Sequence, residues 1–144
     1  MNLSRLGLVP LVLLAAACST GGTASTPTSG APTRINVTLT DALRMEPSAM
    51  TVPAGVPVTF VVTNAGVIDH EFYLGDEAAQ AEHEQEMQSM GGMMHDEPEG
   101  IALDPGQTKE LTFTFADPGD TLAGCHVTGH YAGGMRATIS IVGE

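Results

Sequence analysis

The sequence contains no tryptophan, few aromatic residues and little positive charge. Phe, Tyr and Trp make up 4% of the 144 residues, and five Lys or Arg face seventeen Asp or Glu, for a formal net charge of -12 at pH 7. The scarcity of Lys and Arg argues against a nucleic-acid-binding protein, because phosphates are bound by basic side chains. With 42% hydrophobic residues the chain can still bury one modest core, which aliphatic side chains must largely fill.

Cysteine is also scarce, with only Cys18 and Cys125 in the chain. Arg5 precedes an apolar run over residues 6–17, which is typical of a secretory signal peptide covering residues 1–17. The run is too short for a comfortable membrane span. The Leu-Ala-Ala-Ala sequence before Cys18 resembles a bacterial lipobox, which implies lipidation of Cys18 and attachment to the outer face of a bacterial membrane, in the cell envelope. Ordinary signal cleavage nearby, or a short uncleaved anchor, is the alternative.

A lipidated Cys18 leaves Cys125 without a partner for an intramolecular disulfide. A lone thiol in an exported, oxidising compartment needs a reason, and metal ligation is one. After Cys18, which begins the segment 18–33, residues 19–33 are only Ser, Thr, Gly, Ala and Pro. We expect a disordered tether spanning on the order of 20 Å, because no large apolar residue offsets the entropy of ordering it.

The remaining residues, 34–144, are predicted to form one folded domain. Residues 34–40, 57–63 and 136–142 alternate apolar and polar side chains with a period of two, which is typical of half-buried strands. Turns rich in Pro and Gly separate such stretches. The pattern predicts an all-β fold, an antiparallel β-sandwich with Greek-key connections.

One stretch departs from the β pattern. Residues 76–90 contain no β-branched residue and are rich in Ala, Glu and Gln, which favour helix. Asp76 suits the N-cap position, and the glycines at 91 and 92 should end the helix. We therefore predict a short helix within an acidic, Met- and His-rich insertion over residues 76–100.

Three side chains with affinity for copper cluster near the C-terminus. Cys125, His130 and Met135 have Cys-x4-His-x4-Met spacing, and His70 lies far upstream. Two imidazoles, one thiolate and a weak axial thioether form the ligand set of a blue-copper site. A sandwich can bring such remote segments together at one end, so the sequence predicts a copper site made of these four residues.

The chain resembles the cupredoxins over residues 34–144. The resemblance rests on Asn64-x-Gly66-x3-His70-Glu71-Phe72 and on Gly124-Cys125-x4-His130-x4-Met135, whose loop spacing is similar to that of auracyanin and rusticyanin. It implies a mononuclear type 1 copper that cycles between Cu(I) and Cu(II), ligated by the four residues named above, with Met135 as the long axial ligand.

Two residues depart from the cupredoxin pattern. Thr128 stands where relatives often carry Pro, which implies a less rigid loop. Glu71 follows His70 where plastocyanin- and azurin-like sites place an Asn that braces the cysteine loop. These departures affect the expected support of the site more than its ligand set.

His126 lies beside Cys125, as histidines do in multicopper oxidases. The chain has five His and no His-x-His pair, which a catalytic copper cluster commonly needs, so we do not expect an enzyme. Strand alternation points Cys125 inward and His126 outward. We therefore expect His126 to be a surface residue.

The insertion offers further soft ligands. On the predicted helix, His83, Met87 and Met90 fall at i, i+4 and i+7 and share one stripe. Met93, Met94 and His95 follow immediately, in a Met- and His-rich loop. Two interpretations remain open: an auxiliary Cu(I) site, or packing of the Met stripe on the sandwich.

The leading functional hypothesis is single-electron transfer by a membrane-tethered, monomeric cupredoxin. Residues 69–99 hold ten of the seventeen acidic residues and no Lys or Arg, which favours docking of a basic redox or copper-transfer partner. A merely solvated acidic surface is equally compatible with this composition. The alternative function is an envelope copper carrier, storage or resistance protein that uses the insertion as a second Cu(I) site.

Overall fold

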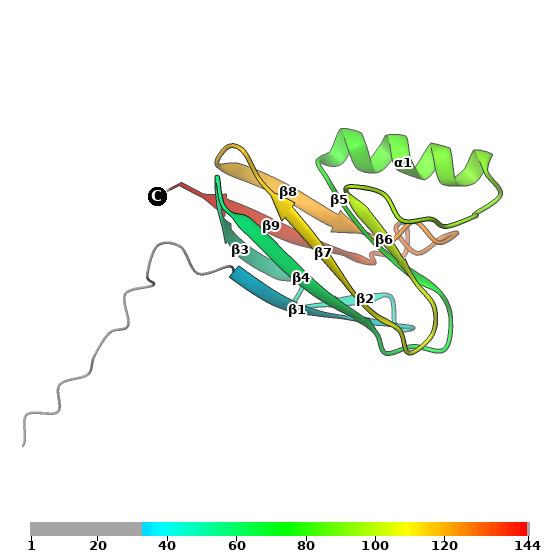
Figure 1. Ribbon diagram of the computed structural model, residues 1–144. Helices are drawn as coiled ribbons and strands as arrows, with labels where there is room; N and C mark the ends of the chain where they lie inside the picture. The colour runs from blue at the N-terminus through cyan, green and yellow to red at the C-terminus, as the bar shows by residue number, and fades with distance from the viewer. Residues whose placement is uncertain (1–32, 144) are drawn as a thin grey trace, which may run out of the picture.

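The computed structural model describes residues 33–143, which form two facing β-sheets and one helix (Figure 1). The first sheet has the order β2 (Arg44–Glu46), β1 (Thr33–Thr40), β4 (Pro57–Asn64) and β7 (Thr108–Thr114). The second has the order β3 (Ala49–Pro53), β9 (Arg136–Val142), β8 (Gly119–Gly124), β5 (His70–Gly75) and β6 (Gly100–Leu103). The predicted signal peptide, lipidated Cys18 and the tether as far as residue 32 lie outside the described residues, and Thr33, which was counted with the tether, is the first residue of β1.

The alternating residues of the strands build the core between the sheets. On β4, Val58, Phe60 and Val62 are fully buried, as the period of two predicts. Phe60 packs against Phe72 of β5 with ring centroids 5.2 Å apart, which joins the two sheets. Aliphatic side chains form most of the remaining core, in keeping with the low aromatic content. The all-β sandwich is confirmed.

The pairing of the strands differs in detail from the prediction. β1 pairs with β4 and β3 pairs with β9 in parallel, whereas the other pairs are antiparallel. Parallel neighbours require crossovers between the sheets, and alternation along one strand carries no information about them. The short strand β2 was not predicted, because three residues are too few to show a period.

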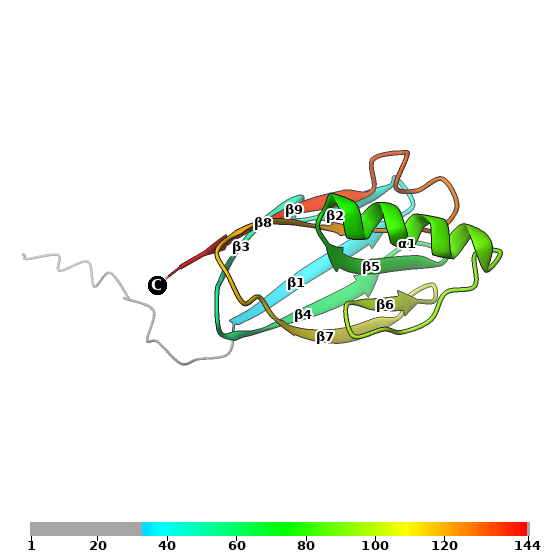
Figure 2. The ribbon, with the colours of Figure 1, turned by 90° about the horizontal axis from the view of Figure 1, so that it is seen from above.

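The inserted helix, α1 (Glu77–Ser89), lies across the outer face of the second sheet, over β5 and beside β8 (Figure 2). Asp76 is its N-cap and accepts a hydrogen bond from the Ala79 N–H at 2.9 Å, as predicted. The helix ends at Met90, just before two glycines with positive φ. Within residues 33–143, no helix is long and apolar enough to cross a membrane.

The strand order brings the predicted ligand segments to one end of the sandwich. The segment 125–135 joins β8 to β9, and β5 is the neighbour of β8 in the same sheet. Figure 1 shows this segment, in orange, at the end of the sandwich opposite to the start of β1 and the end of β9. The ligand end is therefore remote from the end at which the described chain begins.

Candidate metal centre

Three of the four predicted ligands converge. His70 is the first residue of β5, Cys125 directly follows β8, and His130 lies in the segment that leads to β9. The Cys125 Sγ atom is 3.9 Å from His70 Nδ1 and 3.5 Å from His130 Nδ1, and one ligand atom from each residue lies within 4.8 Å of the others. All three side chains are buried. The structure therefore brings these three residues together, and copper binding by them stays a prediction.

The fourth predicted ligand, Met135, is fully buried just before β9. Its backbone closes the loop, since the Cys125 N–H donates to the Met135 carbonyl at 3.2 Å and the Met135 N–H donates to the His130 carbonyl at 3.0 Å. These bonds connect Met135 to Cys125 and His130, the other two predicted ligands in this segment. Its assignment as the axial ligand stays a prediction.

Asp41, at the end of β1, holds His70 in place and was not predicted from the sequence. Its carboxylate lies 3.1 Å from His70 Nε2, so that Nδ1 is the nitrogen left to face Cys125. The Val67 N–H donates to the same carboxylate at 2.9 Å, and with His70 it holds the pKa of Asp41 below its usual value. Such a carboxylate–histidine pair orients ligating imidazoles in metal sites. No spacing signal reveals it, because the two residues are 29 positions apart.

Glu71 takes over the bracing role that the resemblance assigns to an Asn. Its backbone N–H donates to Cys125 Sγ at 3.3 Å, and its side-chain Oε2 accepts from the His126 N–H at 3.1 Å. The side chain is 1% exposed. Glu71 has a longer side chain than the Asn expected from the resemblance. It still connects β5 to the cysteine loop.

Asn64, which the sequence pattern singled out, organises the turn before His70. Its side chain donates to the carbonyls of Ile68 at 2.8 Å and Leu103 at 3.1 Å, and it accepts from the Gly66 N–H at 2.9 Å. A single buried amide therefore fixes the turn that delivers His70 to the site.

Burial controls the proton affinities of the ligands. It raises the pKa of Cys125 to about 12, so the thiol keeps its proton in the absence of a cation. Burial and the neighbouring His70 lower the pKa of His130, which favours the neutral, metal-binding imidazole. A bound cation reverses the preference of the thiol, because a coordinating thiol is deprotonated outright. The site is therefore suited to a metal that binds thiolate strongly.

The residues present fit copper. One thiolate and two imidazoles converge from buried positions, with one imidazole held by a carboxylate, which matches the trigonal set of a blue-copper site. A structural zinc site commonly uses Cys and His as well, but it closes a tetrahedron of strong ligands, and Met135 is a weak one.

The prediction that His126 is a surface residue is wrong. Its ring is 2% exposed and is held by Glu84 Oε2 at Nδ1 and by Gln80 Oε1 at Nε2, both at 2.7 Å. The alternation argument placed His126 on the correct, outer face of β8. Helix α1, which supplies Gln80 and Glu84, covers that face, and alternation within a strand does not report what covers it.

The candidate auxiliary ligands of the insertion are divided between buried and exposed positions. His83 and Met87 are buried beneath α1, at 3% and 1% exposure, whereas Met93 is 69% exposed. Met90 and Met94 are half-buried, and His95 is exposed. Met87 therefore packs as the alternative interpretation expected, and metal binding by this set stays a prediction.

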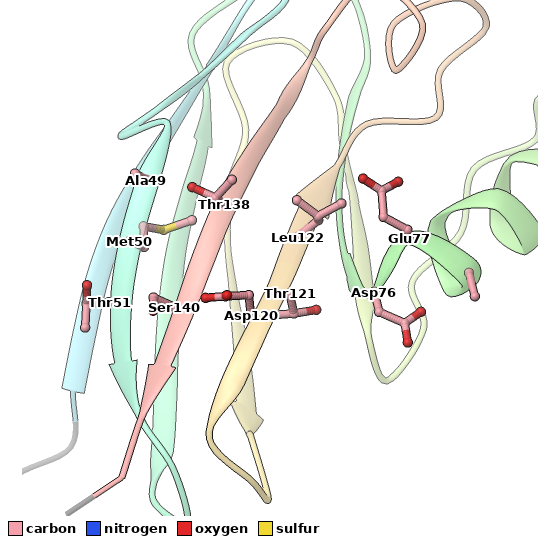
Figure 3. A pocket seen from close by; sticks show the side chains of 11 residues that line it. Ala49, Met50, Thr51, Asp76, Glu77, Asp120, Thr121, Leu122, Thr138 and Ser140 are labelled. Carbon is pink, nitrogen blue, oxygen red and sulfur yellow. The ribbon is translucent and has the colours of Figure 1, made fainter.

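A separate groove of about 800 Å³ lies between the start of α1 and strands β3, β8 and β9 (Figure 3). Asp76, Glu77 and Leu122 line its helix side, and small polar residues of β9 line the other. None of the predicted copper ligands lines it, so it gives no support to a substrate site next to the metal centre.

Proteins with similar sequences are named as copper proteins. The chain is 35% identical over 107 residues to the copper-resistant cuproprotein CopI of Rubrivivax gelatinosus, a match covering 74% of this chain and 65% of that protein. It is 34% identical over 136 residues to CopI of Pseudomonas aeruginosa, covering 74% and 75% respectively. The chain thus spans just under two thirds of the length of the Rubrivivax relative.

Solved structures of blue-copper proteins share the fold. The reduced auracyanin of Roseiflexus castenholzii superposes with a TM-score of 0.69 at 26% identity, covering 78% of this chain and 99% of that one. Auracyanin A of Chloroflexus aurantiacus gives 0.67 at 26% identity, with 78% and 100% covered. The family model for copper binding proteins of the plastocyanin/azurin family matches residues 33–142. Copper is therefore the cofactor, and the chain belongs to the plastocyanin/azurin family of copper-binding proteins.

Proposed function

We propose that this protein binds one copper ion through His70, Cys125, His130 and Met135 and contributes to copper resistance in the bacterial cell envelope. The observation that carries the proposal is the convergence of three buried ligands from remote segments, with His70 already oriented by Asp41. The resistance role is supported by the names of the relatives, each called a copper-resistant cuproprotein.

The chain's own residues explain why copper would be held firmly. The Cys125 thiolate and the two imidazoles are borderline to soft donors that suit copper, and Asp41 and Glu71 keep them in position. All four predicted ligands are less than 9% exposed, which limits access of water and small reductants. When bound, the metal supplies a Cu(I)/Cu(II) couple. A buried ion of this kind is withheld from uncontrolled reactions at the envelope.

Export to the envelope is part of the proposal. The predicted signal peptide of residues 1–17 and the lipobox-like sequence before Cys18 support a domain tethered to the outer face of a membrane. A tether over residues 18–33 would let the ligand end, remote from the start of β1, face arriving copper or a partner.

Single-electron transfer is the second candidate. It is favoured by buried ligands that hydrogen bonds from Asp41 and Glu71 hold in position, because such a site changes little when an electron arrives, and by the likeness to the auracyanins. Val67 and Ile68, three and two residues before His70, are 81% and 43% exposed and offer an apolar contact for a redox partner. A basic partner that also meets the acidic helix would fit the net charge.

Catalysis is not part of the proposed function. The four predicted ligands would complete the coordination of one copper, and a catalytic metal keeps an open position for substrate. His126 is committed to Gln80 and Glu84 through both ring nitrogens, so it is not free to bind a second catalytic copper.

The test is complementation of a deletion in the source bacterium. We expect the deletion strain to grow poorly on copper, the wild-type gene to restore growth, and Cys125→Ser to fail. Ser140→Ala, at an exposed position of β9, is the matched control and should restore growth. Unchanged copper tolerance in the deletion strain would contradict the resistance role.

The same purified variants test electron transfer. We expect the copper-loaded wild type to show an intense thiolate-to-copper absorption that disappears and returns on reduction and reoxidation, and Cys125→Ser to lack it. A copper-loaded wild type without this absorption contradicts the type 1 assignment for either function.

A further inference from the structure

His83 lies on the inner face of α1 and is 3% exposed. Its ring lies flat against Tyr73 of β5, with centroids 3.8 Å apart and an interplanar angle of 1°. The edge of the His126 ring meets it from a second side, with centroids 5.1 Å apart. The two contacts fix the plane of the imidazole and therefore the directions of both nitrogens.

The two nitrogens of His83 have different surroundings. Nε2 lies 2.9 Å from Oε1 of the buried Glu71. Nδ1 is buried and has no hydrogen-bond partner among the described residues, and its distance of 4.0 Å to Glu86 Oε2 is too long for a hydrogen bond. Leaving a buried polar nitrogen unpaired destabilises the fold, so this nitrogen calls for an explanation.

Two carboxylates face this nitrogen from different parts of the chain. Glu86 is one helical turn after His83, and Glu97 lies in the segment between α1 and β6. That segment is held by reciprocal backbone hydrogen bonds between Glu97 and Gly100, of 2.8 and 3.2 Å. One ligand atom from each of His83, Glu86 and Glu97 lies within 4.8 Å of the others. His95 Nε2, 2.7 Å from Glu97 Oε1, adds a further donor at the rim.

We propose that His83 Nδ1, Glu86 and Glu97 form a second metal site, selective for Cu²⁺ and separate from the buried cysteine site. With Nε2 protonated and donating to Glu71, the lone pair of Nδ1 is left for a metal, and Nδ1 lies 4.0 Å from Glu86 Oε2. This is the carboxylate–histidine–metal arrangement that orients ligating imidazoles. Nitrogen and oxygen donors suit divalent copper, and first-row divalent ions bind such sites most tightly when the ion is Cu²⁺.

The site differs from the auxiliary Cu(I) site that was one of the two interpretations left open by the sequence. Its donors are one imidazole and two carboxylates, and the thioethers of Met87 and Met93 are not needed. Glu71 links the two metal sites, because its carboxylate meets His83 while its backbone N–H donates to Cys125 Sγ at 3.3 Å. Glu71 therefore contacts a ligand of each site. The existence of the second site does not depend on the proposed function.

The test is titration of copper-loaded protein with Cu²⁺, followed by paramagnetic resonance and visible absorption. After one equivalent has filled the cysteine site, we expect a second equivalent to give an ordinary tetragonal Cu²⁺ spectrum with no gain in thiolate absorption. The double variant Glu86→Gln/Glu97→Gln should bind the second ion at least about tenfold more weakly, since even loss of an outer partner of a metal ligand costs that much.

Asp117→Asn/Asp120→Asn is the matched control, because it removes the same charge from exposed positions on another part of the chain and should bind like the wild type. Three results would overturn the proposal: no second equivalent bound by the wild type, equal binding by the Glu86/Glu97 variant, or equal weakening in the control. The first equivalent reports on the cysteine site alone, so failure of one site is distinguished from failure of the other.

Discussion

Replacing Glu71 by Gln tests the buried network that joins α1 to the metal centre. Glu71 is 1% exposed, and its two carboxylate oxygens meet the His83 ring at 2.9 Å and the His126 N–H at 3.1 Å. Gln keeps the size and one acceptor but removes the charge. A hydrogen bond to a charged group stabilises by about 1.5–3 kcal/mol and a neutral one by about 0.5–1.5, so we expect a loss of about 1–2 kcal/mol.

The loss should depend on pH in a defined direction. Burial opposes a charged imidazole at residue 83, but the hydrogen bond and charge of Glu71, together with the charges of Glu97 and Glu86, outweigh it and raise the pKa of His83. A raised pKa in the folded state stabilises below the unfolded value of about 6.5, and this contribution is lost as pH rises through the folded value. The deficit of Glu71→Gln should therefore be larger at pH 6 than at pH 9.

Thermal unfolding of the copper-free protein measures both effects. For a domain of about this size, the expected loss lowers Tm by roughly 4–8 °C at pH 6. Glu82→Gln, an exposed change on the same helix, is the control and should stay within about 0.5 kcal/mol of the wild type. An unchanged Tm at pH 6, or an equal deficit at both pH values, would refute the reasoning.

Three further substitutions probe the supports of the site and the helix. Asp41→Asn, which removes the charge beside His70, should weaken copper binding by about 10–100-fold while the ligands remain, as measured by competition with a copper chelator. Gly66→Ala would place a methyl group against the Asp41 carboxylate, so it should also weaken copper binding. In the double variant it should add little to the effect of Asp41→Asn, because both changes act through Asp41. Fully additive losses of copper affinity would contradict this coupling. Asp76→Ala removes the N-cap bond to Ala79 and should cost about 1 kcal/mol in urea unfolding, with no effect on the copper absorption.

The predictable part of the fold comes from local patterns. Alternation of apolar residues located the longer strands, and Asp76 with the two glycines located the ends of α1 to within a residue. Strand β2 and the two parallel pairings were not predictable in this way, because a three-residue strand has no period and pairing direction depends on where the chain crosses between sheets.

The sequence by itself determined which side chains could ligate the metal. Cys-x4-His-x4-Met is a local spacing, and the chemistry of thiolate, imidazole and thioether belongs to the residues themselves. These properties do not depend on the three-dimensional structure, so a copper protein with a β scaffold could be inferred from the sequence alone.

Only the tertiary structure decided what surrounds the ligands. Asp41 meets His70 across 29 residues, Glu71 joins the cysteine loop to His83, and helix α1 buries a histidine that strand alternation placed at the surface. These contacts depend on which elements pack together. Burial and hydrogen bonding between remote segments determine which imidazole nitrogen is free to bind a metal and whether the thiol keeps its proton. Local sequence spacing predicts neither.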